Sequence, residues 1–373
     1  MLYLFGKWFG DSWGPLRLLN SHLMLLSIGT MLGGLLVWSR LPRLWHLLPR
    51  DKCKVLAADG GSKAAGKPTG AGLMISLLLL PVILLVVPMD VSILGVVICL
   101  YLAMLFGYLD DASAKPWGEL KKGLLDALVA LAAAFCICKG QPVEIWLPVI
   151  KSTLTVGPWL YIPCAAALLW FTMNATNCSD GVDGLAGSLT LISLFSLAAL
   201  LYGVVGYLPI ARYLLVPHYA NGARWAILTA TVAGGLAGYL WHNAEPSRVL
   251  MGDAGSRMLG LLVGVAVLAA GNPFLVIVVA PVALVNGGTG LLKMVLLRLL
   301  KRVGFDTTPP NRLTPEAAAH QHLVVRALHH YRFPLHDHCR KNMMWSNAQV
   351  LMRFVLVQAF LTPALFVILI KIR

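Results

Sequence analysis

Charged residues are scarce in this chain. Only 12% of its 373 residues are Asp, Glu, Lys or Arg, and only 16 are acidic, whereas charged residues make up about 25% of an ordinary soluble domain. Hydrophobic residues reach 58%, and the mean hydropathy is +0.76. A soluble core cannot bury so much apolar surface, so the composition excludes a soluble globular protein and predicts an integral membrane protein.

Cysteine patterns of known structural use are also absent. The seven cysteines show neither zinc-like spacing nor the spacing of a disulfide framework. Cys136 and Cys138 form a C-x-C pair, but it lies inside an apolar run, where packing is the favoured interpretation. The sequence therefore predicts neither a disulfide scaffold nor a zinc centre.

What the chain has instead is a series of long apolar runs. A membrane-spanning helix needs about 20 mostly apolar residues, and these runs are continuous rather than alternating, which excludes a closed barrel of strands. We therefore predict an all-α integral membrane protein with about ten transmembrane helices. The runs lie near 18–38, 71–88, 90–107, 123–138, 158–173, 185–206, 224–241, 257–271, 273–298 and 347–370.

Lys and Arg are distributed unevenly between alternate loops. One set of loops holds most of them, including those at 40–67, 115–122 and 298–341, whereas the other set and both termini hold few. Because cytoplasmic loops of membrane proteins carry the excess of Lys and Arg, both termini are predicted to be periplasmic. The net charge of +14 then fits anionic lipid headgroups better than nucleic acid.

No repeat or low-complexity linker divides the sequence, so residues 1–373 are predicted to form a single polytopic membrane domain. Its longest polar segment is a basic, His-rich cytoplasmic loop at 299–346. Within that loop, Thr314 followed by Pro315 predicts the start of a short amphipathic helix.

The few acids gather at the cytoplasmic ends of the predicted spans. Three segments supply them, FGYLDD, NATNCSDGVDGLAG and MGDAGS, with the carboxylates Asp110, Asp111, Asp180, Asp183 and Asp253. Charges close to hydrocarbon are costly and usually functional. Carboxylates that converge on one face need a cation between them, and oxygen ligands beside a substrate phosphate suit Mg²⁺.

Each acidic segment alone has a simpler interpretation. A pair of aspartates at a span end is often a solvated helix cap, and GDAGS is compatible with a turn followed by a helix N-cap. DGVDG is compatible with a turn or a calcium loop, although the EF-hand spacing is absent. Their occurrence together on one face, in a chain with so few acids, favours an active site.

Basic and imidazole side chains complement these acids. Lys63, Lys67, Lys121 and Lys122 are candidates to neutralise phosphates as point charges. His336 and His338 lie in PLHDHCRKN before the last span. Their spacing is compatible with diphosphate binding or with a structural role in the loop.

In this order and between this number of spans, these motifs resemble those of the polyprenyl-phosphate N-acetylhexosamine-1-phosphate transferases. The likeness is greatest to the branch that transfers phospho-MurNAc-pentapeptide. It covers nearly the whole chain and includes GKPTGAG at 66–72. The resemblance implies an enzyme of the bacterial inner membrane that takes UDP-MurNAc-pentapeptide and undecaprenyl phosphate and releases lipid I and UMP in peptidoglycan synthesis. It also implies Mg²⁺ as cofactor and raises a homodimer as the assembly.

The same resemblance assigns roles to residues. Asp253 would ligate Mg²⁺, and Asp110, with Asp111 beside it, would act as base or as the acid that positions the acceptor. His336 and His338 would match the outer members of a catalytic three-histidine motif. The substrate-binding residues implied are Lys63, Thr69, Lys122, Asn177, Asp180, Asp183 and Asn243.

Two departures from the family pattern keep alternatives open. Asp337 stands where a middle histidine is expected, and Leu250 stands where an aromatic residue able to stack on uracil is usual. A UDP-GlcNAc transferase of the same superfamily and a non-catalytic binder of the lipid carrier therefore remain as alternatives. A transporter is disfavoured, because the spans carry almost no charge besides Lys293 and Arg353.

Overall fold

The computed structural model describes residues 1–51, 66–148, 152–309 and 321–371. Its elements, in chain order, are α1 (Leu2–Phe9), η1 (Gly14–Asn20), α2 (His22–Leu44), η2 (Trp45–Leu47), α4 (Ala71–Val86), α5 (Val91–Ala112), α6 (Glu119–Cys138), β1 (Val143–Ile145), β2 (Leu154–Val156), α7 (Pro158–Cys178), α8 (Leu185–Leu200), η3 (Leu201–Val205), α9 (Leu208–Tyr213), α10 (Gly222–Asn243), α11 (Gly252–Ala269), α12 (Leu275–Val279), α13 (Pro281–Ala283), η4 (Leu284–Gly288), α14 (Thr289–Arg302), α16 (Leu323–His330), α17 (Leu335–Lys341) and α18 (Asn347–Lys371).

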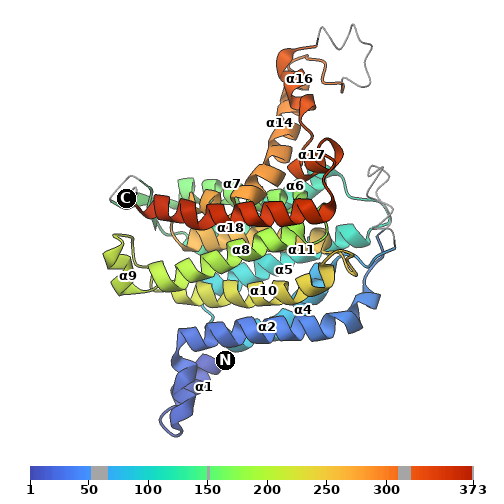
Figure 1. Cartoon of the computed structure of the whole chain (residues 1–373). Coiled ribbons are helices and arrows are strands. Elements are labelled where there is room, and N and C mark those ends of the chain that lie inside the picture. The colour runs from blue at the N-terminus through green and yellow to red at the C-terminus, as the bar shows by residue number, and fades with distance from the viewer. Residues whose placement is uncertain (52–65, 149–151, 310–320, 372–373) are drawn as a thin grey trace.

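Every predicted apolar run contains helix, and the long helices lie side by side in one bundle (Figure 1). Within the described ranges, six helices are long and apolar enough to cross a membrane, so the chain is a mostly helical, multi-pass membrane protein. These six are His22–Leu47, Val91–Ala112, Leu185–Val205, Gly252–Ala269, Pro281–Arg302 and Asn347–Ile370.

Close helix contacts in the bundle rest on small residues. Gly33 and Gly34 of α2 face α10, where a Cβ on Gly234 would collide with the carbonyl oxygen of Thr30. Lipid chains are as apolar as leucine, so membrane helices associate mainly through close packing of this kind. Helix α10 is accordingly buried along almost its whole length.

The predicted span at 273–298 is not one regular helix. It is divided into α12, α13, the π-helix η4 and α14. Pro281 begins α13 and lacks an amide hydrogen, which interrupts the helical hydrogen bonds at this point. Beyond the π-helix, α14 leaves the bundle at a steep angle and approaches α16 (Figure 1).

One further prediction needs correction. The all-α prediction missed a small antiparallel sheet, in which Val143 pairs with Val156 and Ile145 with Leu154. The helix predicted after Thr314 falls mostly outside the described residues. Its described part contains α16, which begins at Leu323, and His322 caps α16 by accepting from Val324 N at 3.3 Å. Thr314 itself lies outside the described residues.

Candidate active site

The start of α4 meets the ends of α5 and α11 that carry acidic motifs, and the contacts between the three helices are made through glycines. A Cβ on Gly107 of α5 would collide with the carbonyl of Asp253, and one on Gly72 of α4 would collide with the amide nitrogen of Gly255. Only glycine lets these backbones approach so closely. The end of α5 is thereby fixed against the start of α11.

The two neighbouring aspartates of α5 have different partners. Asp111 accepts hydrogen bonds from the amides of Asp253, at 3.2 Å, and Ala254, at 3.1 Å. These amides belong to the first turn of α11 and have no partner within the helix, so Asp111 caps α11 from another helix. Gly252, with φ of +70°, brings its backbone against the same carboxylate. The capping interpretation of the DD pair therefore holds for Asp111.

Asp110 instead faces Lys122. The Lys122 ammonium group forms ion pairs with Asp110 and, at 3.2 Å, with Asp253. The other oxygen of Asp110 accepts from the Trp117 amide at 2.7 Å. Asp110 is buried, and one cation between two carboxylates offsets the repulsion between them. The structure thus brings together three predicted site residues from α5, α6 and α11.

A buried ion pair that the sequence analysis missed lies next to Asp253. Nη1 of Arg257 donates to both carboxylate oxygens of Asp126, at 2.7 and 2.6 Å, while its Nη2 donates to Asp253 at 3.2 Å. Asn174 Nδ2 also donates to Asp126, at 3.3 Å. The prediction that the spans carry almost no charge besides Lys293 and Arg353 was therefore wrong for α6 and α11, which hold Asp126 and Arg257. The available signal was Asp126 itself, a carboxylate inside a predicted span.

The GKPTGAG segment at 66–72 pairs with the segment before α11. The Leu250 amide donates to Pro68 O at 2.8 Å, and the Ala71 amide donates to Leu250 O at 3.1 Å. Lys67 donates to Ser247 Oγ at 2.8 Å and forms an ion pair with Asp183 at 3.5 Å. Lys67 is therefore the described lysine of this loop that reaches the acids.

The other predicted residues of this loop have different outcomes. Thr69 is half-buried, and its amide donates to Pro49 O at 2.9 Å. Lys63 lies outside the described residues.

Asn243 connects two of the acidic segments. Its Oδ1 accepts from the Gly184 amide at 2.8 Å, and its Nδ2 donates to Val249 O at 2.8 Å. The side chain is buried, and both ends of its amide are engaged. Asn243 therefore holds the loop after α7 against the segment before α11.

Asn177, at the end of α7, offers an unused donor. Its Nδ2 is buried and has no hydrogen-bond partner among the described residues. Its carbonyl accepts from the amide of Asp180, which is half-buried. Because a buried amide donor without a partner is costly, a substrate acceptor is the natural partner for Asn177.

The two predicted histidines have separate environments. His336 is buried, and both its amide, at 2.8 Å, and its Nδ1, at 3.1 Å, contact Asn286 Oδ1, so Nδ1 carries the hydrogen. Nε2 lies against Gly181, where a Cβ would collide with the ring. Burial lowers the pKa of His336 to about 4. The ring is therefore neutral near pH 7 and directs Nε2 toward the Asp180–Asp183 loop.

His338 points elsewhere. Its Nδ1 accepts from the Arg332 amide at 3.4 Å, and its ring lies 5.6 Å from that of Tyr331. These contacts hold the ring within its own loop, away from the surroundings of His336.

The donor set fits a magnesium ion that arrives with substrate. Within the described ranges, no three His, Cys, Asp or Glu side chains form a metal-binding group. Asp110 and Asp253 nevertheless share one cationic group, the Lys122 ammonium. Mg²⁺ usually binds one or two carboxylates and completes its octahedron with waters and substrate phosphates, so these two carboxylates fit it.

Residues 93–271 match the family described as glycosyl transferase family 4. Over 364 residues the chain is 43% identical to the phospho-N-acetylmuramoyl-pentapeptide-transferase of Treponema pallidum (strain Nichols), covering 96% of this chain and 93% of the relative. Two relatives with the same name are more distant. The one from Bartonella quintana (strain Toulouse) is 28% identical, covering 84% of this chain and 83% of the relative. The one from Ruegeria pomeroyi is 29% identical, covering 81% of this chain and 80% of the relative.

Proposed function

Because this chain belongs to the phospho-N-acetylmuramoyl-pentapeptide-transferase family, we propose that it transfers phospho-MurNAc-pentapeptide from its UDP conjugate to undecaprenyl phosphate. The products would be lipid I, for peptidoglycan synthesis, and UMP. The observation that carries this proposal is the convergence of Asp110 and Asp253 on Lys122.

The reaction is an exchange at phosphorus. An oxygen of the carrier phosphate bonds to the β-phosphorus of the UDP-sugar, and the bond from that phosphorus to the oxygen bridging to the α-phosphate breaks. UMP leaves with the bridging oxygen and its electron pair. Catalysis of such a step consists mainly of positioning and charge neutralisation.

Asp110 is not needed as a proton acceptor in this scheme. A phosphate monoester is already largely ionised at pH 7, since its second pKa is about 6. We infer that Asp110 orients the Lys122 ammonium group, which it contacts directly, and that Lys122 neutralises the reacting phosphates. Asp111 supports the site by capping α11.

Magnesium is proposed as the cofactor. Asp253 would hold it, with Asp110 nearby through their common lysine. Bound Mg²⁺ supplies positive charge to the diphosphate. Arg257, clamped by Asp126, keeps the Asp253 carboxylate directed toward Lys122.

The nucleotide is proposed to lie along the loop after α7. The free amide of Asn177 and the Asp180–Asp183 turn would contact the nucleotide side. Lys67 would neutralise phosphate, and the neutral His336 offers Nε2 as an acceptor. His338 is proposed to act in the same loop without direct contact with the acids.

The membrane topology completes the proposal. All ten predicted runs contain helix and are proposed to cross the bacterial inner membrane, with both termini periplasmic and the acids on the cytoplasmic face. This face is where a soluble nucleotide and a lipid phosphate can meet. A homodimer stays a prediction.

A transfer assay tests the function. Purified protein with undecaprenyl phosphate and Mg²⁺ is given UDP-MurNAc-pentapeptide or UDP-GlcNAc, and UMP release is followed. We expect UMP from the first donor only, because the relatives compared share the phospho-MurNAc-pentapeptide name. Release from UDP-GlcNAc alone would assign the chain to the other branch. No release from folded protein would support a binding role.

A further inference from the structure

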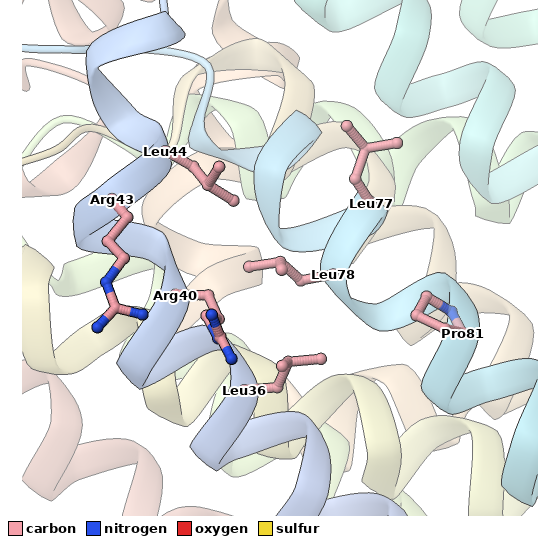
Figure 2. Close-up of a pocket in the computed structure, with 7 residues that line it drawn as sticks. All are labelled: Leu36, Arg40, Arg43, Leu44, Leu77, Leu78 and Pro81. Atoms are coloured by element: carbon pink, nitrogen blue, oxygen red, sulfur yellow. The ribbon is translucent and has the colours of Figure 1, made fainter.

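A groove between α2 and α4 lies apart from the candidate active site. Its volume is about 440 Å³, within the range of small-molecule sites. Figure 2 shows Leu36 of α2 facing Leu77, Leu78 and Pro81 of α4 across the groove, with Arg40 and Arg43 on its α2 side. The wall is therefore apolar on α4 and carries two positive charges on α2.

Both arginines are exposed. Among the residues that the structure describes, neither guanidinium group has an acidic partner or a hydrogen-bond acceptor. Two cations that have no acidic partner within the described ranges, beside an apolar groove, favour an anionic ligand. A guanidinium group binds phosphate oxygens through paired hydrogen bonds.

The charged and the apolar parts of the groove follow one another along the helices in the same order as the headgroup and the acyl chains of a lipid. Helices α2 and α4 run antiparallel, since Gly29 meets Val86 while Gly33 meets Leu79. The arginines lie near the end of α2, on the side where α4 begins next to α11. Leu36 and Pro81 lie further toward the middle of the bundle. The charged end of the groove is thus the end proposed to face the cytoplasm.

We propose that the α2–α4 groove binds one anionic glycerophospholipid, with an acyl chain on Leu36, Leu77 and Pro81 and the headgroup phosphate on Arg40 and Arg43. A soluble anion would leave the apolar wall of the groove uncovered. A zwitterionic lipid would place the cationic group of its headgroup close to the two arginines, which would repel it.

Binding of phosphatidylglycerol to the full chain tests this site. Delipidated protein in neutral detergent is titrated with phosphatidylglycerol or phosphatidylcholine, and bound lipid is counted by native mass spectrometry. We expect one phosphatidylglycerol per chain and much weaker binding of phosphatidylcholine. The double variant Arg40→Gln, Arg43→Gln should bind phosphatidylglycerol about thirtyfold more weakly, since each arginine near a lipid surface contributes about 1 kcal/mol.

Matched controls separate the groove from general surface charge. Arg302→Gln with Arg326→Gln removes two exposed arginines elsewhere and should leave binding unchanged. Leu77→Trp fills the groove while keeping both charges and should also weaken phosphatidylglycerol binding. If the double arginine variant unfolds at a lower temperature than the parent, its loss of binding is not informative, and the result with Leu77→Trp tests the site instead. Unchanged binding in both groove variants, equal binding of the two lipids, or binding of undecaprenyl phosphate alone would overturn the proposal.

Discussion

Arg257 holds Asp126 through a single nitrogen, Nη1, which donates to both carboxylate oxygens at 2.7 and 2.6 Å. The second nitrogen, Nη2, is therefore left for Asp253, one helical turn earlier on α11. Both members of the pair are almost fully buried. A buried charge without its partner is strongly destabilising, so each member requires the other.

Removing one member of this pair should damage both stability and turnover. Asp126→Ala removes the carboxylate that takes both hydrogen bonds of Nη1 on the buried Arg257 and leaves only the contact with Asp253. The loss of stability should be about 3–5 kcal/mol. Thermal unfolding and UMP release measure the two effects.

The double variant Asp126→Leu, Arg257→Met separates these effects. Apolar replacement of a buried ion pair is often neutral for stability, so the unfolding temperature of the double variant should return toward that of the parent. Turnover should stay low, because Asp253 then lacks the contact with Arg257 that orients it. Full recovery of turnover would show that Arg257 has no positioning role.

The neighbouring aspartates should respond differently to substitution. Asp111→Ala removes the cap of α11 and should cost about 0.5–2 kcal/mol of stability together with turnover. Asp110→Ala should lower turnover with a smaller effect on stability, since its main partner is the lysine side chain. Unfolding and UMP release are measured on both variants in parallel. The assignment fails if Asp110→Ala proves to be the less stable of the two.

Asp253→Asn should abolish Mg²⁺-dependent turnover and leave the fold intact. The substitution keeps the size of the side chain but removes the negative charge that would hold the metal. Mn²⁺ binding followed by electron paramagnetic resonance, in the presence of UDP-sugar, gives a readout besides activity. A variant that binds Mn²⁺ and turns over like the parent would refute the metal assignment.

His336 should make stability depend on pH. Its folded pKa, about 4, lies below its ordinary value of 6.5 because burial disfavours the charged ring. The unfolded chain therefore takes up the proton first as pH falls. The stabilising contribution is complete above pH 6.5 and is lost progressively between pH 6.5 and pH 4.

Unfolding temperatures at pH 7 and pH 5 check this dependence. His336→Gln should narrow the difference between the two, whereas His322→Gln, at an exposed position, should not. Equal pH dependence in His336→Gln and the parent would contradict the assignment.

The sequence predicted the helices and the acids for physical reasons that it contains. Long apolar runs need only local information, and carboxylates such as Asp253 are conspicuous in a chain with few charges. Asp126 was missed because it lies in an apolar run and its partner, Arg257, is distant in sequence. The sequence allowed a capping role for the Asp110–Asp111 pair but did not show that Asp111 caps α11, because the amides that it binds belong to another helix. Partners that meet only through tertiary packing have no local signature.

The π-helix at Leu284–Gly288 sets the rotational register of the segment that follows it. A π-turn holds one more residue than an α-turn, so deleting one residue there would rotate the flanking parts by about 100° relative to each other. At present Gly287 packs on the backbone of α7 while its neighbour Asn286 orients His336 of α17. The additional residue allows this segment to pack Gly287 against α7 and to hold His336 of α17 at the same time. A chain shortened by one residue there could keep one of these two contacts only by losing the other.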